Sequence, residues 1–362
     1  MASSLLAESP DLIAPDAADR DLLHRLVAIE SLSDHEGEAV AELCQQMERR
    51  GFRAAIDGAG NAVGTIGHGE RRVVLLGHID TVPGRIPVRL DQGVLFGRGT
   101  VDAKGPLCTF VAAATAAADR ANLTITVVGA VGEERLGSPG ATAIAQWPAP
   151  DFCVIGEPSG WESLCLGYRG TAGLHYRLRH PARHSAGPGE AIAEHAVAFW
   201  NALVAEIAVR NEAAGATGGF ASITPSLRGM AASGDGLTDE ATLTIGVRLP
   251  PGADIDGLID RARELAGDAE LSIDGIQHGY REDKRSPLVP PFLRAIRAAG
   301  GTPRFTVKLG TSDVTIVGPI WRCPIVTYGP GDAALDHTPE ERIDLADYAR
   351  AIRVLTDVLV SL

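Results

Sequence analysis

Arg72-Val-Val-Leu-Leu-Gly-His-Ile-Asp80 is the most informative segment for the architecture of this chain. Its continuous apolar run is typical of a strand that is buried on both faces of a parallel sheet. The run ends at His78, and Asp80, two residues on, projects from the same face of the strand. A lone His-x-Asp pair is weak evidence for a metal site, because a histidine near a strand end is more often structural.

Two more apolar runs of this kind occur later in the chain, and acidic residues follow each of them. Leu123–Val131 precedes Glu133 and Glu134, and Phe152–Ile155 precedes Glu157. Helical patterns separate the runs, and this alternation predicts an α/β domain with a mixed central sheet flanked by helices. Because open α/β sheets place their sites at the carboxyl ends of strands, we expect these acids at one edge of the sheet.

The pattern changes after Gly167. The order becomes strand–helix–strand–strand–helix–strand, which matches a split βαβ sandwich with an antiparallel four-stranded sheet. Residues 168–282 are therefore predicted to form an inserted α+β, ferredoxin-like domain. Residues 1–167 and 283–362 would form a first domain that is discontinuous in sequence, and a chain of 362 residues is long enough for two domains.

Two loops add further candidate ligands. Asp102 lies in Arg98-Gly-Thr-Val-Asp-Ala-Lys-Gly-Pro106, just ahead of a helix, where a helix N-cap is the alternative role. His337 lies in Asp336-His-Thr-Pro-Glu340, before the last helix, where Thr338 as an N-cap is the alternative. Two histidines and several carboxylates on separate loops make the mixed nitrogen and oxygen shell that Zn²⁺, Co²⁺ or Mn²⁺ accepts, so a metal site is the leading hypothesis.

Bulk properties exclude several classes of protein. The net charge of −13 opposes binding to nucleic acid or to an anionic membrane. Met1–Pro15 lacks the features of a leader, and no run of about 18 uncharged apolar residues occurs, so we expect a cytoplasmic protein without a membrane span. No G-x-G-x-x-G loop follows an early strand, which argues against a dinucleotide enzyme. Five scattered cysteines predict buried free thiols: Cys44, Cys108, Cys153, Cys165 and Cys323.

At this point the chain resembles, over nearly its whole length, the di-zinc aminoacylase, carboxypeptidase and succinyl-diaminopimelate deacylase family of metallopeptidases. The matching blocks occur in order: Gly77-His-Ile-Asp-Thr-Val-Pro83, Gly99–Lys104, Glu133–Glu134, Gly156-Glu-Pro-Ser159 and His337. The resemblance implies a hydrolase of linear amide bonds that uses two divalent ions, zinc or cobalt. It also implies that the inserted domain is a lid and dimerisation domain.

The same resemblance implies roles for individual residues. Five side chains would hold the two ions: His78, Asp102, Glu134, Glu157 and His337. Asp102 would bridge the ions, with His78 and Glu157 on one of them and Glu134 and His337 on the other. Glu133 resembles the family's general base, and Asp80 would orient His78 from behind.

Residues of the inserted domain also resemble functional residues of the family. Gly167-Tyr-Arg-Gly170 resembles a Gly-Arg-Arg-Gly element, with Tyr168 a departure. Counting on from it, His184 falls where relatives keep a histidine that reaches the active site of the opposite subunit, which implies a homodimer. Arg248 resembles the lid arginine that grips a substrate carboxylate. For both residues an ordinary surface position is the alternative.

A last group of motifs indicates the substrate. Gly310, Thr311 and Ser312 resemble the family's substrate-side loop, where Asp313 could contact an amino group or form a turn. With the turn at Tyr328-Gly-Pro-Gly331, this loop looks most like deacylases that release lysine, or ornithine, from the C-terminal glutamate of an amino-group carrier protein in amino-acid biosynthesis.

Basic clusters could receive an acidic carrier despite the acidic net charge. They lie at Arg177–His184 and Arg281–Arg285. One alternative is a deacetylase of N-acetylornithine or N-acetyllysine, or a succinyl-diaminopimelate desuccinylase, with the same machinery. A more distant alternative is a catalytically inactive binding protein of the same fold.

Overall fold

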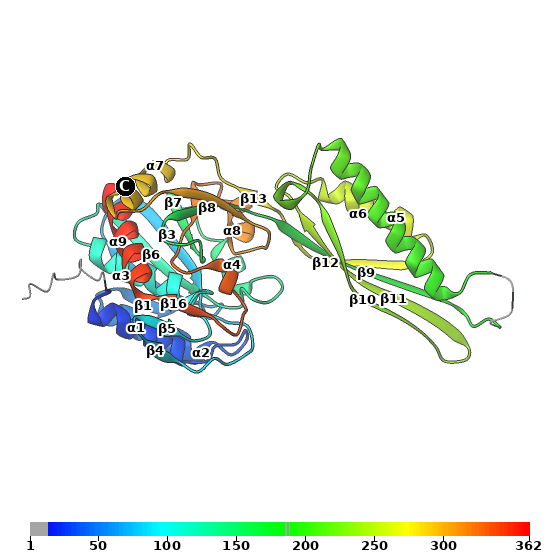
Figure 1. Cartoon of the computed structure of the whole chain (residues 1–362), viewed down its shortest axis with the longest axis horizontal. Coiled ribbons are helices and arrows are strands. Elements are labelled where there is room, and N and C mark those ends of the chain that lie inside the picture. Colours follow the sequence, from blue (N-terminus) through cyan, green and yellow to red (C-terminus); the bar gives the residue numbers. More distant parts are fainter. Residues whose placement is uncertain (1–13, 185–186, 188) are drawn as a thin grey trace, which may run out of the picture. The chain divides into compact units, whose positions relative to one another are not determined.

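Figure 1 shows the computed structural model of the chain, which describes residues 14–184, 187 and 189–362. The chain divides into two compact units. The first takes in the described residues up to Leu166, together with Glu282–Thr306 and Ile320–Leu362, and the second comprises Gly167–Arg281 and Val307–Pro319. The segment Met1–Pro15, which lacks the features of a leader in sequence, lies mostly outside the described residues.

The first unit is built on a mixed sheet. Its strands, in spatial order, are β1 (Arg53–Ile56), β2 (Ala62–Gly67), β6 (Leu123–Ala130), β3 (Arg71–His78), β7 (Phe152–Gly156), β15 (Ile325–Thr327) and β8 (Ser163–Tyr168). Strand β3 runs parallel to both of its neighbours, β6 and β7, while β2 and β8 join antiparallel. β8 also pairs with β13 (Tyr280–Arg281) and β14 (Arg304–Lys308). The predicted mixed central sheet is confirmed.

Helices flank this sheet, as Figure 1 shows. They are α1 (Ala17–Ala28), α2 (Gly37–Arg49), α3 (Lys104–Ala117), α4 (Pro139–Ile144), α7 (Val289–Ala298) and α9 (Leu345–Ser361). Helix α3 is buried around nearly its whole circumference, because its alanine-rich sequence lets neighbouring elements approach closely. A small sheet joins β4 (Arg89–Asp91), β5 (Val94–Phe96) and β16 (Arg342–Asp344). The core centres on β3, β6 and β7, where Leu75, Val127 and Val154 are fully buried.

The second unit has the predicted order of elements. They are β9 (Gly170–Pro181), α5 (Ile192–Ala213), β10 (Thr224–Gly234), β11 (Thr238–Leu249), α6 (Ile255–Ala266) and β12 (Glu270–Gln277). The four strands form an antiparallel sheet in the order β10-β11-β9-β12, and both helices lie on one face of it (Figure 1). Tyr176 of β9 stacks on Phe199 of α5, with ring centroids 4.6 Å apart.

By length and composition, α5 is the single helix in the described part of the chain that could cross a membrane. It also carries charged residues, among them Glu194, Glu206 and Arg210. Phe199 and Leu203 are buried against the sheet of the second unit. The apolar residues of α5 therefore include those that hold the second unit together.

One segment falls in a different unit from the one we predicted. Residues 283–362 were assigned to the first domain, but Val307–Pro319 belongs with the second unit. Hydrogen bonds explain this grouping, since Arg169 N donates to Gly310 O at 3.0 Å and Thr315 Oγ1 donates to Gln277 Oε1 at 3.0 Å. The segment includes most of helix α8 (Val314–Trp321), which the sequence pattern did not predict.

All five cysteines are free, as predicted. Four are buried, and Cys323 is half-buried. Burial raises the pKa of the Cys323 thiol to about 11. These thiols therefore act as small apolar side chains at neutral pH.

Candidate metal centre

Three neighbouring parallel strands deliver candidate ligands to one edge of the sheet. His78 is the last residue of β3 and pairs with Ala130 at the end of β6, after which Glu133 and Glu134 follow. On the other side of β3, Gly77 pairs with Gly156, the residue before Glu157. Because the three strands are parallel and in register, their carboxyl ends coincide, and the polar residues after them meet.

A first group of donors consists of His78, Asp102 and Glu157. Their ligand atoms all lie within 4.8 Å of one another. His78 Nε2 lies 3.1 Å from Asp102 Oδ1 and 3.9 Å from Glu157 Oε1. All three residues are buried.

A second group consists of Asp102, Glu134 and His337. His337 Nε2 lies 3.0 Å from both Asp102 Oδ2 and Glu134 Oε1. Asp102 is thus common to both groups and directs one carboxylate oxygen to each histidine. The tertiary structure brings His337 to Glu134 from 203 positions along the chain.

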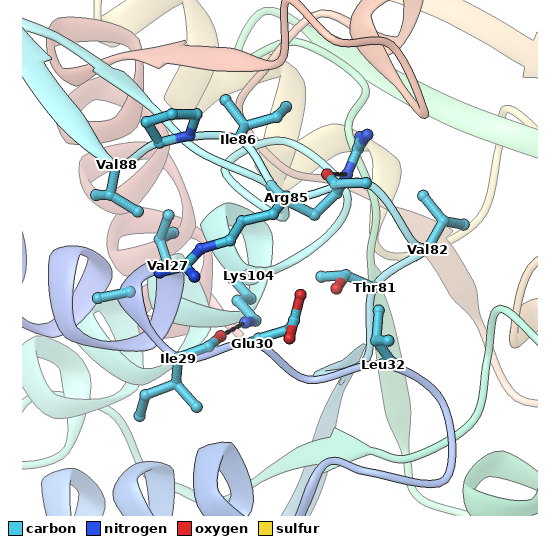
Figure 2. A pocket seen from close by; sticks show the side chains of 14 residues that line it. Val27, Ile29, Glu30, Leu32, Thr81, Val82, Arg85, Ile86, Val88 and Lys104 are labelled. Atoms are coloured by element: carbon cyan, nitrogen blue, oxygen red, sulfur yellow. Dashed lines mark hydrogen bonds between the residues drawn. The ribbon is translucent and has the colours of Figure 1, made fainter.

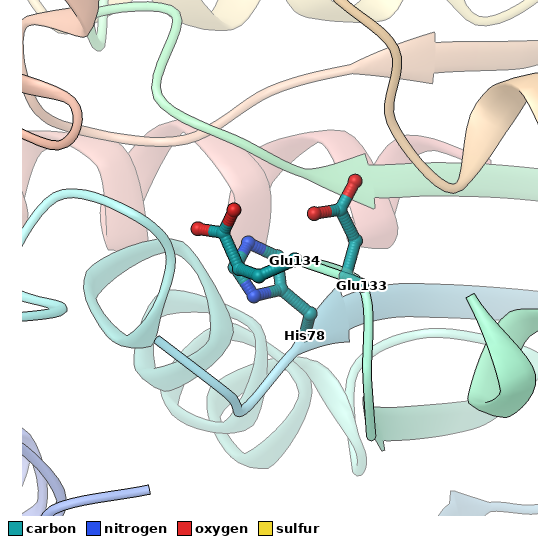
Figure 3. A group of neighbouring side chains, drawn as sticks. All are labelled: His78, Glu133 and Glu134. Atoms are coloured by element: carbon teal, nitrogen blue, oxygen red, sulfur yellow. The ribbon is translucent and has the colours of Figure 1, made fainter. Parts of the chain in front are cut away.

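Glu133 belongs to the same cluster. With His78 and Glu134 it forms a third set of donor atoms within 4.8 Å. Figure 3 shows the carboxylates of Glu133 and Glu134 beside the imidazole of His78. Glu133 is half-buried, whereas His78 is fully buried. The predicted base candidate therefore lies within reach of the ligand candidates without belonging to either of the first two groups.

The surrounding carboxylates favour positive charge at this edge of the sheet. Burial alone would lower the pKa of His78, but hydrogen bonds with Asp102 and Asp80 outweigh it and raise the pKa well above its usual range. The pKa of His337 is raised to about 10, by hydrogen bonds with Asp102 and Glu134. Two sets of nitrogen and oxygen donors that share one carboxylate fit two divalent cations of the zinc, cobalt or manganese class.

Asp80 lies directly behind the cluster and organises it. It is fully buried, and its carboxylate accepts hydrogen bonds from Ser33 Oγ at 2.7 Å, Glu133 N at 3.0 Å and Glu134 N at 3.1 Å. Its own carbonyl lies 3.0 Å from His78 Nδ1. Asp80 therefore holds both the loop that carries the two glutamates and one side of the imidazole ring.

Glu341 is a supporting residue that the sequence analysis missed. Its fully buried carboxylate accepts from Val101 N at 2.9 Å and Asp102 N at 3.1 Å, and pairs with Arg98 Nη1 at 2.8 Å. Neither N-cap alternative holds. Ala103 occupies the N-cap position of α3 without a side-chain hydrogen bond, and Asp344 caps α9. In sequence, Glu341 only follows another glutamate, and nothing local signals its role.

Glu341→Ala is expected to destabilise the protein by about 3–5 kcal/mol, because it leaves the Arg98 guanidinium without its buried partner. The Asp102 loop would also lose two hydrogen bonds, so metal affinity should fall with stability. Denaturant unfolding and metal titration measure the two effects. Asp21→Asn, which breaks the exposed ion pair with Arg25, is the control and should leave both unchanged. Equal effects in the two variants would contradict the role given to Glu341.

Figure 2 shows a cavity next to this site, of about 340 Å³. Thr81 and Lys104, close in sequence to Asp80 and Asp102, are among the residues that line it. The Lys104 ammonium donates to the carbonyls of Leu26 at 2.9 Å and Ile29 at 2.7 Å, and burial lowers its pKa to about 8. Lys104 therefore ties the Asp102 loop to the end of α1.

The other predicted site residues lie in the second unit. They are His184, Arg248, Gly310, Thr311 and Ser312. His184 is exposed after β9, Arg248 is half-buried in β11, and Ser312 is buried, where its Oγ accepts from Val314 N at 3.4 Å. The structure thus brings the five predicted ligands together with Glu133 and Asp80 in the first unit. The five other predicted site residues, from His184 to Ser312, belong to the second unit.

Comparisons with known proteins identify the family of this chain. The model of peptidase family M20/M25/M40 matches residues 74–361. A [LysW]-lysine hydrolase from Deinococcus radiodurans is 46% identical over 96% of this chain and 98% of its own length. A putative [LysW]-lysine/[LysW]-ornithine hydrolase from Thermococcus kodakarensis is 36% identical over 94% of this chain and 91% of its own.

Solved structures share the fold at low sequence identity. An M20 family metallo-carboxypeptidase from Sulfolobus solfataricus superimposes with a TM-score of 0.78 at 16% identity, over 96% of this chain and 99% of that one. A dinuclear metal-binding M20 peptidase from Bacillus subtilis gives a TM-score of 0.71 at 12% identity, over 95% and 97%. From the family model that spans most of its length and from its close relatives, this chain belongs to peptidase family M20/M25/M40.

Proposed function

We propose that this chain is a two-metal amide hydrolase that releases lysine from the C-terminal glutamate of a small carrier protein. The observation that carries the proposal is the sharing of Asp102 by two donor groups, His78–Asp102–Glu157 and Asp102–Glu134–His337. The substrate comes from the relatives, since the one that is 46% identical is named a [LysW]-lysine hydrolase. Ornithine, which appears in the names of other relatives, is the second candidate product.

Zinc or cobalt fits the donor set, and each ion would take one histidine, one glutamate and one oxygen of the shared Asp102 carboxylate. His78 and Glu157 would hold one ion, and Glu134 and His337 would hold the other. Asp102 would contact both ions. When bound, the ions would supply a Lewis acid for the amide carbonyl and lower the pKa of the attacking water. Asp80 fixes the tautomer of His78 by its contact with Nδ1.

Glu133 is the general base in this proposal. Its carboxylate takes one proton from the water as the oxygen forms its bond to the amide carbon. The carbon–nitrogen bond then breaks, and Glu133 returns that proton to the leaving nitrogen, which departs as the amine of lysine. The products are free lysine and the carboxylate of the carrier glutamate. Asp80 holds the Glu133 backbone, so the base is oriented by the same residue that orients His78.

The basic clusters Arg177–His184 and Arg281–Arg285 are weaker candidates for carrier docking than the sequence alone indicates. Arg177 and Arg179 both donate to Glu240, and Arg285 is paired with Asp283. Two arginines share one carboxylate in the first cluster, so the charge of the clusters is partly compensated within the chain.

We also propose a cytoplasmic homodimer in which His184 serves the partner's active site. Strand β10 is an edge of its sheet, and its residues are exposed along nearly the whole strand. Helix α5 exposes Val197, Val204 and Val209. An open strand edge next to exposed apolar residues is a surface that a second copy could cover. Light scattering on the purified protein tests this, and a monomer mass would contradict it.

The activity is tested by free-amino-acid release from the zinc- or cobalt-loaded enzyme. We expect lysine from carrier-linked lysine, with little release from N-acetyllysine, N-acetylornithine or succinyl-diaminopimelate. Release from the small acylated substrates alone would make the protein a general deacylase. No release from any substrate, with both ions bound, would point to an inactive binding protein.

A further inference from the structure

The segment Ser31–Asp34, between α1 and α2, lies alongside the chain that follows β3. Ser31 Oγ donates to Ile79 O at 2.8 Å, and Ser31 O accepts from Thr81 N at 2.8 Å. Leu32 forms a parallel bridge with Thr81. These contacts fix the register between the segment and the end of β3, and both belong to the first unit.

This register places the hydroxyl of Ser33 against the buried carboxylate of Asp80. Ser33 Oγ donates to Asp80 Oδ2 at 2.7 Å, and Glu134 N donates to the same oxygen at 3.1 Å. The other oxygen, Oδ1, accepts from Glu133 N at 3.0 Å and lies 3.4 Å from His78 Nδ1. Each oxygen of Asp80 thus has its own partners, and a turn of the carboxylate about its bond to Cβ would separate them.

Ser33 holds this carboxylate from a different part of the chain than the loop of the two glutamates does. The N–H groups of Glu133 and Glu134 belong to one loop, so they can move together with the carboxylate that they bind. The terminal torsion of an aspartate side chain is broad and sets the orientation of the carboxylate only loosely. Ser33 lies 47 positions before Asp80, on a segment joined to the end of β3, so its hydroxyl fixes the carboxylate relative to the sheet. The loop that carries the two glutamates follows the carboxylate.

A second contact links the same two parts of the chain. Arg135, the residue after Glu134, pairs with Asp34, the residue after Ser33. Both side chains of this pair are exposed, and exposed ion pairs contribute little to stability. The hydrogen bond from Ser33 ends instead on a buried carboxylate, and bonds to an ionised group are roughly twice as strong as bonds between neutral groups. Of the two contacts, the one from Ser33 is therefore the one that sets the position of the loop.

We propose that Ser33 is a positioning residue for the metal centre. Through Asp80 it fixes the loop that carries Glu133, the proposed base, and Glu134, a proposed ligand. A hydroxyl suits this role because it donates one hydrogen bond without bringing a charge, so Asp80 keeps its negative charge next to His78. The part of this inference that concerns Glu133 rests on the proposed function, whereas the part that concerns metal binding needs no substrate.

Ser33→Ala tests this role in the full-length, cobalt-loaded protein. We expect metal affinity and kcat each to fall by about 10-fold, at the lower end of what the loss of a group behind the ligands causes, because Ser33 acts through Asp80. KM should change little, since Ser33 lies behind the carboxylates that face the substrate. The visible absorption of bound cobalt should also change, because it reports the geometry of the ligands. Metal titration, absorption spectroscopy and steady-state kinetics with carrier-linked lysine measure these quantities.

Ser31→Ala is the matched control, because it removes a hydroxyl hydrogen bond from the same segment, but one made to the backbone carbonyl of Ile79. It should lower stability in denaturant without changing metal affinity, the cobalt spectrum or kcat. Ser33→Thr keeps the hydroxyl and should retain most of the metal affinity and of kcat. Ser33→Cys is similar in size to serine but a weak donor, so it should behave like Ser33→Ala, and it replaces that variant if the alanine protein does not fold.

The outcomes separate this role from the proposed function. If Ser33→Ala lowers stability alone, as Ser31→Ala should, then Ser33 is a structural residue and the positioning role is wrong. Wild-type metal affinity, cobalt spectrum and kcat in Ser33→Cys would equally overturn it, because the hydroxyl would then not matter. If the wild type binds both ions but releases no amino acid from any substrate, the proposed function fails, and metal titration and the cobalt spectrum still decide the role of Ser33.

Discussion

Glu133→Gln is expected to lower kcat about 10²–10⁴-fold while both divalent ions remain bound. Glutamine keeps the size and the hydrogen-bonding carbonyl of glutamate but cannot take a proton from water. Its backbone N–H would still donate to Asp80, so the loop should keep its conformation. Steady-state kinetics with carrier-linked lysine, together with metal analysis by mass spectrometry, measures the two quantities.

The neighbouring residue provides the matched control for this prediction. Glu134→Gln makes the same chemical change one position along, on a side chain that contacts His337 Nε2 at 3.0 Å. We expect this variant to lose metal as well as activity, whereas Glu133→Gln loses activity alone. If Glu133→Gln also lost an ion, Glu133 would be a ligand. If it kept full activity, another group would be the base.

Asp102→Asn is expected to weaken the binding of both ions. The loss of metal affinity should exceed the roughly 10–100-fold that follows when a residue hydrogen-bonded to a metal ligand is replaced. Its two carboxylate oxygens lie close to different histidines, Oδ1 to His78 and Oδ2 to His337. Asparagine offers one oxygen, carries no charge and places an NH₂ group where the other acceptor was. Metal titration and stoichiometry after dialysis against a weak chelator measure the loss.

Thermal unfolding checks the same variant independently. Ions that bind only the folded state stabilise it by mass action, so the wild type should unfold at a higher temperature with metal than after chelation. This difference should largely disappear in Asp102→Asn. The melting temperature without metal should also fall, because the substitution removes the carboxylate whose hydrogen bonds raise the pKa of His78 and His337. Asp119→Asn, on an exposed position, is the control. A normal metal-dependent shift in Asp102→Asn would rule out the shared-ligand role.

Much of the candidate centre could be predicted because it is built on strand ends. β3, β6 and β7 are apolar runs. His78 is the last residue of β3, Glu133 and Glu134 come just after β6, and Glu157 directly follows β7. Parallel neighbours in register must bring such residues together, whatever the details of packing. His337 has no such strand before it. Its loop made it a candidate ligand, but only the family resemblance paired it with Glu134.

Short or irregular elements escaped prediction for local reasons. Helix α8 contains Gly318 and Pro319, which hide its helical pattern. Strands β4, β5 and β16 have three residues each, too few for a period to be seen. β8 is buried throughout, and a short apolar run of this kind does not distinguish a strand from other buried segments.

Local apolar patterns and the polar residues that end them were enough to establish two domains, a mixed α/β sheet and most of an acidic, histidine-containing centre. They suffice because strand polarity and side-chain alternation act over a few residues. Which carboxylate holds the Asp102 loop was decided only by the tertiary structure. Glu341 accepts a hydrogen bond from a backbone N–H 240 positions away, so its role depends on long-range packing that no local pattern records.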